Sequence, residues 1–372
     1  MAFTIKPFTD DLIPAVKGLN SRLTAGGAPP EFRFPENPTP EWLPKIDNRP
    51  IYREYFVLLV DDVVRGAYAF KHQDFSFRGE LRSVGFFHWP ISEGMVSKDY
   101  APVALQMLRY AHREHPLLYG LGFGEYDAGP LPKILQALRW RLCQVPFHFK
   151  VNRPQRFLRE IRALRKSAMH KMLLDLAVFT GTGTLALRML QRARTERTTP
   201  DLQAERVEYF DRWADALWEE CAERYAMIAV RDSDTLNILY PAERQRFLSY
   251  KVTRGGTVLG WVVLLDTPMQ DNKYFGNLRV GSIIDCLALP ENTSAVIRTG
   301  TRVLEESGVD VIVSNQSHAA WSTALRHAGF LAGPSNFSFA ASKELAEVLH
   351  PFDVEFPETH FNRGDGDGPI HL

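Results

Sequence analysis

Hydrophobic and polar positions along the first 150 residues follow a pattern typical of a mixed α/β domain. Two β-type runs meet at Asp61-Asp62, which predicts a hairpin. The periodicity then predicts a strand over 83–91, a helix over 99–115, a strand over 117–124, a helix over 131–140 and a strand over 141–151. Strands that alternate with single helices indicate a mixed sheet covered by helices.

The chain from residue 201 onward repeats this order of elements. We expect a helix over 207–225, a hairpin turning at Gly255-Gly256, a strand over 279–289, a helix over 293–308, a strand over 309–316, a helix over 317–330 and a strand over 335–342. The stretch 227–241 follows neither period and is expected to be irregular.

Matching positions in the two blocks are separated by nearly constant offsets. The pairs are Gly66 with Gly260 (260 − 66 = 194), Gly85 with Gly281 (281 − 85 = 196) and Trp140 with Phe330 (330 − 140 = 190). An offset that varies so little over the length of a domain predicts two copies of one fold.

The segment between the blocks is strongly basic. Residues 151–200 hold 11 Lys plus Arg against three acids. An apolar centre follows three arginines spaced by three, and Gly181 and Gly183 interrupt it, so we expect one or two helices. Two roles stay open: a helix that bridges two domains through its arginines, or a cationic surface that contacts a membrane through 151–197. The expected organisation is therefore an N-terminal domain at 1–150, a basic helical connector at 151–200 and a C-terminal domain at 201–372.

Composition is ordinary for a globular chain of 372 residues, with 45% hydrophobic and 24% charged residues. Lys plus Arg and Asp plus Glu both total 44, and this balance argues against a dedicated nucleic-acid binder. The three cysteines show no metal-type spacing, and the opening residues lack the apolar core of a signal peptide. We expect a cytoplasmic protein, with peripheral attachment at the inner membrane face as the alternative through its basic segment.

Three motifs of the second block resemble a known family. The stretches SNQSHAAWSTALRHAGF, VLGWVVLL and GSIIDCLALP resemble the acyl-CoA N-acyltransferase fold, called the GNAT fold. RDSDTLNILYP and HFNRGDGDGP are similar to tandem GNAT proteins of exosortase and polysaccharide loci, which are distant relatives of Fem-type aminoacyltransferases. The resemblance implies an α/β protein of two GNAT-like domains, each a mixed twisted sheet flanked by helices. It also implies transfer of an acyl group from acyl-CoA to an amine, without a metal.

The family holds the pyrophosphate of coenzyme A on a glycine-rich loop before a helix. In the second block that position reads PENTSAV, which has no glycine. The first block reads ISEGMVSKDY and is the better candidate. The candidate cofactor-binding residues are Ser92, Gly94, Met95, Val96 and Ser97. An ordinary loop with a helix cap is the alternative.

Acyl transfer to an amine needs a proton acceptor, a donor for the oxyanion and a proton for the departing thiolate. On the first central strand the candidate base is His88, because an imidazole ordinarily titrates near neutrality; a half-buried histidine bonded to a backbone carbonyl is the alternative. On the second it is Asp285, a carboxylate in an apolar run, for which an ion pair with Arg279 or Arg231 is the alternative. Tyr126, after the first short strand, is the candidate acid for the thiolate, with packing as the alternative.

Candidate substrate-binding residues are Arg231, Asn315, Asp365 and Asp367. The two acids belong to GDGDGP, where free glycines and alternating acids can form a turn, a cation site or an amine-binding pocket, and a plain solvated tail is the alternative. His112 and His115 share a helix face without a third ligand nearby in sequence, so no metal site is expected.

Several functions stay open from the sequence. The first is N-acyl transfer from acyl-CoA to a small-molecule or envelope-precursor amine. The second is transfer of a long acyl chain to a lipid amine at the membrane surface, as in ceramide-type acylation. The third is an aminoacyl-tRNA-dependent transferase or a non-catalytic GNAT-like binding protein, since a fold alone does not establish activity.

Overall fold

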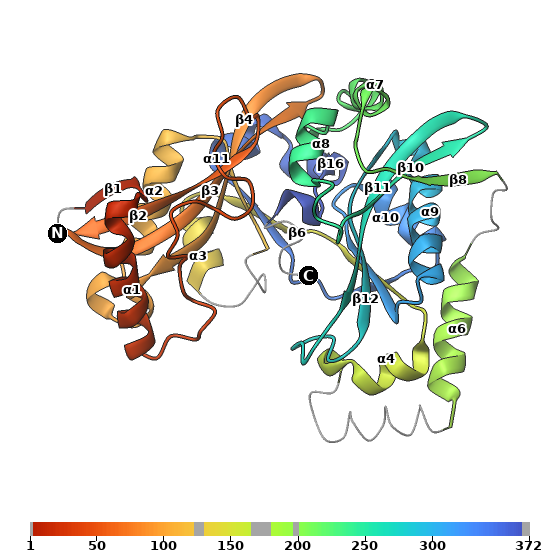
Figure 1. Ribbon diagram of the computed structural model, residues 1–372, viewed down its shortest axis with the longest axis horizontal. Helices are drawn as coiled ribbons and strands as arrows, with labels where there is room; N and C mark the ends of the chain where they lie inside the picture. The colour runs from red at the N-terminus through yellow and green to blue at the C-terminus, as the bar shows by residue number, and fades with distance from the viewer. Residues whose placement is uncertain (1–2, 123–129, 165–179, 196–200, 367–372) are drawn as a thin grey trace. The chain divides into compact units, whose positions relative to one another are not determined.

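The computed structural model describes residues 3–122, 130–164, 180–195 and 201–366 (Figure 1). The chain forms two compact units. Unit 1 comprises Met1–Phe75, Leu81–Cys143 and Ser338–Phe352, and unit 2 comprises Ser76–Glu80, Gln144–Phe337 and Asp353–Leu372. This division differs from the continuous ranges 1–150, 151–200 and 201–372 expected from the sequence, because the basic segment belongs to unit 2 and a late stretch of chain belongs to unit 1.

Unit 1 is built on a mixed sheet with the strand order β1-β2-β3-β4-β5-β15-β6. Its strands are β1 (Phe3–Pro7), β2 (Tyr52–Val60), β3 (Val63–Phe77), β4 (Glu80–Ser92), β5 (Leu118–Leu121), β6 (Arg141–Gln144) and β15 (Ser338–Ala341). Its helices of six residues or more are α1 (Ile13–Ala25), α2 (Val103–Glu114), α3 (Pro130–Ala137) and α11 (Lys343–Val348). β4 and β5 are parallel, whereas β1, β2 and β3 pair antiparallel.

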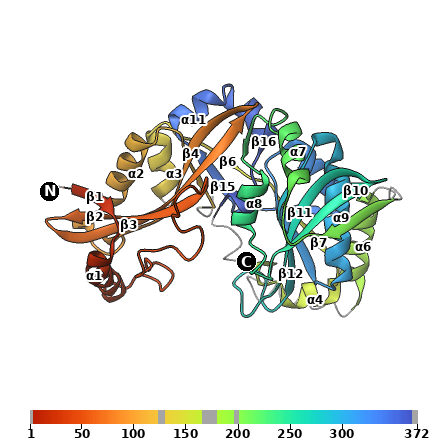
Figure 2. The same cartoon turned by 45° about the horizontal axis from the view of Figure 1, so that its top comes forward.

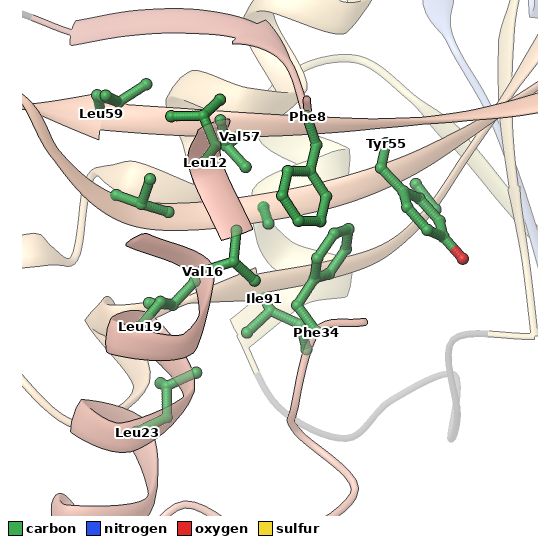
Figure 3. Packing of buried hydrophobic residues seen from close by; sticks show 13 residues of the cluster. Phe8, Leu12, Val16, Leu19, Leu23, Phe34, Tyr55, Val57, Leu59 and Ile91 are labelled. Atoms are coloured by element: carbon green, nitrogen blue, oxygen red, sulfur yellow. The ribbon is translucent and has the colours of Figure 1, made fainter. Parts of the chain in front are cut away.

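Two apolar clusters hold the helices of unit 1 on opposite faces of its sheet. On one face, α1 packs through residues such as Val16 onto Val57 and Ile91, and Figure 3 shows Phe8 and Phe34 facing one another there. The other cluster packs the α2 and α3 side chains on the sheet, with Tyr68 at its centre. Burial of these side chains from water is the main stabilisation of the unit.

Unit 2 contains a second mixed sheet, in the order β14-β7-β13-β12-β11-β10-β8. Its strands are β7 (Phe147–Val151), β8 (Leu202–Arg206), β10 (Leu248–Arg254), β11 (Thr257–Pro268), β12 (Arg279–Ala288), β13 (Val311–Asn315) and β14 (Leu331–Gly333). In the same unit, β9 (Met227–Ala229) and β16 (Thr359–His360) pair with one another and do not belong to this sheet. Its longer helices are α4 (Pro154–Glu160), α6 (Thr182–Arg194), α7 (Arg212–Cys221), α8 (Ser233–Leu239), α9 (Thr293–Glu306) and α10 (Ala319–His327). Figure 2 shows α9 beside β10 and β11, and α4 lies near α6.

Each sheet contains a strand from a distant part of the chain. The single strand expected over 141–151 is wrong, because Val145 and Pro146 separate β6 in the first sheet from β7 in the second. Proline has no N–H to donate to a ladder, so a strand ends there readily. β15 lies between β5 and β6, and β7 lies between β13 and β14.

Gly66 and Gly260 hold matching positions in the two sheets. Gly66 pairs with Leu58 at a bulge between β2 and β3, and Gly260 pairs with Val252 at a bulge between β10 and β11. A methyl group on Gly66 would lie 2.6 Å from a side-chain carbon of Val103, the first residue of α2. On Gly260 it would lie 2.4 Å from the carbonyl oxygen of Leu287 on β12 and 2.5 Å from a side-chain carbon of Val296 on α9. Both positions need glycine because a helix packs directly on the strand.

Two further differences from the expected elements lie near the start of the second block. The helix expected over 207–225 begins only at Arg212, because the Asp211 side chain accepts a hydrogen bond from Trp213 N and caps it there. The stretch 227–241, expected to be irregular, forms β9 and α8. Asp232 caps α8 by accepting from Thr235 N at 2.8 Å.

Candidate functional site

The central strand of each sheet separates from its parallel neighbour part-way along its length. β4 pairs with β5 only at Gly85 and Phe86, and His88 lies two residues beyond the last pair. β12 pairs with β13 from Val280 to Ile283, and Asp285 lies two residues beyond. The two candidate proton acceptors predicted from the sequence therefore occupy matching positions, each just past the point where the strands diverge.

His88 belongs to an aromatic stack within unit 1. Its side chain is buried, and its ring stacks on Phe86 with centroids 4.6 Å apart. Phe86 stacks in turn on Tyr119 of β5 at 4.8 Å. The ammonium of Lys71 lies 5.4 Å from the centroid of the Phe86 ring. The stacking fixes the orientation of the imidazole. The Lys71 ammonium lies over the Phe86 ring, on which the imidazole stacks.

Three buried polar residues on β2 and β3 were not predicted from the sequence. Arg53 and Lys71 face one another across the strands, and Gln73 lies two residues further along the same face. Neither amide atom of Gln73 has a hydrogen-bond partner among the described residues, although the side chain is 2% exposed. The signal was present in the sequence as charged and amide residues within a strand pattern, since such groups are rarely buried without a reason.

The predicted phosphate loop forms two short 3-10 turns after β4. Ser92 Oγ accepts from Gly94 N at 3.1 Å, and the carbonyl of Glu93 accepts from Val96 N and Ser97 N. A methyl group on Gly94 would lie 2.6 Å from the carbonyl oxygen of Tyr100, so this glycine allows close packing. Three amides of the loop are thus bonded within it. Among the other candidates, Met95 is 46% exposed and Val96 packs on the α1 core.

Glu93 lies within this loop and was not among the residues predicted from the sequence to bind the cofactor. Its buried carboxylate pairs with Arg22 Nε at 2.9 Å and Arg65 Nη1 at 2.8 Å. Two guanidinium groups therefore meet one carboxylate, which leaves one positive charge at the loop. Coenzyme A binding by this loop stays a prediction.

Asp285 lies in a fully buried ion pair with Arg231, which was the alternative weighed for it. Its Oδ2 accepts from Arg231 Nε at 2.9 Å and from the Tyr240 hydroxyl at 2.7 Å. Its Oδ1 accepts from Asn362 Nδ2 at 2.8 Å. Burial raises the pKa of Asp285 even with the guanidinium beside it. Arg279 instead pairs with Asp266 at 2.7 Å.

The C-terminal segment 359–366 bridges the two diverging strands of unit 2. Asp365 binds Arg231 Nη2 at 2.5 Å, and Arg363 Nε donates to Asn315 Oδ1 at 3.0 Å. Phe361 N donates to Ser317 Oγ at 2.7 Å. Three predicted substrate-binding residues, Arg231, Asn315 and Asp365, are thus brought together, and they bind one another through this segment.

One imidazole lies beside this segment and a second, His360, belongs to it. His318 caps α10 by accepting from Ala320 N at 3.1 Å, and the His360 ring lies against Tyr225. Burial lowers the pKa of both histidines to about 4. They are therefore neutral at pH 7, as suits side chains of a packed core.

Tyr126 and Asp367 lie outside the described residues. Within residues 3–122, 130–164, 180–195 and 201–366, no group of three or more His, Cys, Asp or Glu side chains is arranged to hold a metal ion. In the same part of the chain, no helix combines the length and the apolar character that a membrane span requires.

Comparison with solved structures places this geometry in a known fold. A protein from Enterococcus faecalis V583, described as a probable N-acyltransferase, is 10% identical, covers 94% of this chain and 75% of its own, and has a TM-score of 0.51. A GCN5-related N-acetyltransferase from Anabaena variabilis gives 10% identity, 94% and 74% coverage and a TM-score of 0.51. The chain has a GNAT-like fold. The N-myristoyltransferase of Saccharomyces cerevisiae is a weaker likeness, with 11% identity, 91% and 82% coverage and a TM-score of 0.48.

Sequence comparisons do not refine this result. No protein-family model matches the chain, and no curated protein sequence matches it. The predicted fold class, an α/β protein with two mixed sheets flanked by helices, is confirmed. The resemblance to exosortase-locus and Fem-type proteins stays a prediction.

Proposed function

We propose that this protein is an N-acyltransferase that moves an acyl group from acyl-CoA to an amine, and that unit 1 carries the reaction. The observation behind this proposal is the contrast between the two strand divergences. In unit 2, Asp285 and Arg231 are bound to the chain's own C-terminal segment. In unit 1, His88 stands at the matching position, and its ring stacks on Phe86, over whose ring the Lys71 ammonium also lies.

The proposed chemistry uses the divergence of β4 from β5. The amine nitrogen attacks the thioester carbonyl carbon, a C–N bond forms, the C–S bond breaks, and coenzyme A leaves as a thiolate that takes up a proton. His88 accepts the proton that the amine loses. A backbone N–H of β4 beyond Phe86, where pairing with β5 has ended, donates to the developing oxyanion.

The similarity of the two units supports a tandem arrangement of one acyltransferase fold. Gly66 and Gly260 match in their pairing and in the helix that they admit, and His88 matches Asp285. We infer that unit 2 has kept the architecture and uses the position of Asp285 for an ion pair. Its role in this proposal is structural. The amine acceptor is a small molecule or an envelope precursor.

The test is a thiol-release assay with acetyl-CoA and long-chain acyl-CoAs against a panel of amines. Loss of a positioned general base typically lowers the reaction rate about 10²–10⁴-fold. We therefore expect His88→Ala to lower kcat by at least about 100-fold and to leave the melting temperature unchanged. His112→Ala is the matched control, because His112 lies in the same unit and pairs with Glu344 on its surface. A His88→Ala enzyme with the wild-type rate would remove the residue assignment. Absence of thiol release with every acyl-CoA and amine would direct the search to aminoacyl-tRNA or a binding role.

A further inference from the structure

Helix α6 is attached to unit 2 along one face only. Gln191 is buried and binds both backbone groups of Val151, with Val151 N donating to Oε1 at 3.0 Å and Nε2 donating to Val151 O at 3.1 Å. Leu187, one turn earlier, packs on the apolar cluster that joins α4 to the sheet. These two contacts fix the helix and determine which side chains face away.

The opposite face of α6 carries exposed apolar side chains. Leu185 is 58% exposed and Met189 is 63% exposed, and they are four residues apart on one side of the helix. Leu190 flanks them at 45%. Leu185 and Met189 are among the most exposed large hydrophobic side chains of the described chain. Burying them against a partner surface would be favourable, because it would remove apolar area from water.

Arginines occupy the same outward face. Arg188 and Arg192 follow Leu185 at three and seven residues, so the four side chains form one stripe of two apolar and two cationic groups. Within the described residues, the arginines of α6 form no ion pair, and the helix contains no acid. By contrast, Arg156 of α4 pairs with Asp310, and Arg162 pairs with Asp271. The positive charge of α6 is therefore not neutralised within the described chain.

We propose that the outward face of α6 is a docking surface for an anionic phospholipid membrane. Leu185 and Met189 enter the boundary between headgroups and acyl chains, while Arg188 and Arg192, which lie together along one edge of this apolar pair, bind lipid phosphates. The charge argues for this occupant, since an apolar partner surface would leave both guanidinium groups without counter-charges. This inference stands independently of the proposed acyl transfer, and it places any acylation at the membrane surface when both hold.

The experiment is flotation of the full chain with two kinds of vesicle. One is pure phosphatidylcholine, and the other contains about 30% phosphatidylglycerol. We expect binding to the anionic vesicles only, weakened by 0.5 M salt because screening shortens the range of the attraction. Each arginine near an anionic surface contributes about 1 kcal/mol, so Arg188→Gln with Arg192→Gln should lower the partition coefficient by at least tenfold.

Two further variants separate the apolar contribution from a general effect of exposed side chains. Leu185→Ser with Met189→Ser should also lower the partition at least tenfold, whereas Leu81→Ser, at a 61% exposed leucine of β4, should leave it unchanged. Circular dichroism checks that the variants fold. Wild-type protein that stays with the buffer, or α6 variants that float as well as wild type, would overturn the proposal. So would a dimer that the Leu185→Ser, Met189→Ser variant dissociates, because the stripe would then bind a second copy of the chain.

Discussion

The carboxylate of Asp285 accepts hydrogen bonds from four donors. They are Arg231 Nε, the Tyr240 hydroxyl, Asn362 Nδ2 and the backbone N of Cys286. The side chains of Asp285 and Arg231 have no contact with solvent. Because the lone pairs of the Asp285 carboxylate are used by these four hydrogen bonds, none is directed at a substrate. We infer that this carboxylate joins β12 to the C-terminal segment. The buried Arg231 side chain depends on it, since Asp365 is its only other carboxylate partner among the described residues.

The main effect of removing the Asp285 carboxylate should be a loss of folding stability. Asp285→Ala leaves Arg231 with one carboxylate in a buried position, and breaking a buried pair typically costs about 3–5 kcal/mol. The measurement is the free energy of unfolding by urea. Asp266→Ala, which removes the partly exposed pair with Arg279 on neighbouring strands, should cost at most about 1 kcal/mol. An Asp285→Ala protein of wild-type stability without acyl transfer would instead make unit 2 the catalytic unit.

The sequence could identify the residues of this network better than its contacts. A carboxylate in an apolar run signals a partner or a cleft, which identified Asp285, and Arg231 was one of the two partners considered for it. Tyr240 and Asn362 come from 45 and 77 residues away along the chain, and neither distance leaves a local pattern. Gln73 and Lys71 were not predicted because they lie in the polar run KHQD, which follows the β-type run that ends at Phe70 and looks like exposed chain.

At the scale of elements, the match between Gly66 and Gly260 leads to a prediction about helix packing. Gly66→Ala places a methyl group 2.6 Å from Val103 and 3.0 Å from the Met107 sulfur. Overpacking of this kind typically costs about 1–3 kcal/mol. Val103→Ala alone should also destabilise unit 1, by opening a cavity. The double variant should be more stable than the sum of the two losses, because the smaller side chain makes room for the methyl group.

A double-mutant cycle followed by urea unfolding measures this coupling. Additive losses would mean that α2 does not rest on Gly66, and the match with Gly260 would lose its physical basis. Elements with a strong period were predicted well: α9 begins at Thr293 as expected, and the turns at Asp61-Asp62 and Gly255-Gly256 have the positive φ angles of tight hairpins. The exchange of β7 and β15 was not, because hydrophobic alternation does not specify which sheet receives a strand.

At the scale of the whole molecule, three buried histidines of unit 2 make stability depend on pH. Burial lowers the pKa of His148, His318 and His360 to about 4 in the folded chain, whereas an unfolded chain protonates its histidines near 6.5. Between these values the unfolded state binds protons that the folded state does not. The contribution of these three histidines to the free energy of unfolding is therefore fully present above about pH 6.5, and it is lost as the pH is lowered toward 4.

The slope of the unfolding free energy between pH 6.5 and 5 reports how many protons are involved, at about 1.4 kcal/mol per pH unit for each. Ordinary carboxylates titrate mostly below this window, so the histidines dominate it. We expect His360→Gln to reduce the slope by about one proton, because glutamine does not titrate. NMR of the wild-type protein gives a second readout, in which these three imidazoles keep their neutral chemical shifts down to pH 5. Three imidazoles that titrate near 6.5 in the folded chain would show that this part of unit 2 admits water, and the C-terminal segment would then be an opening cover over Asp285 rather than part of a closed core.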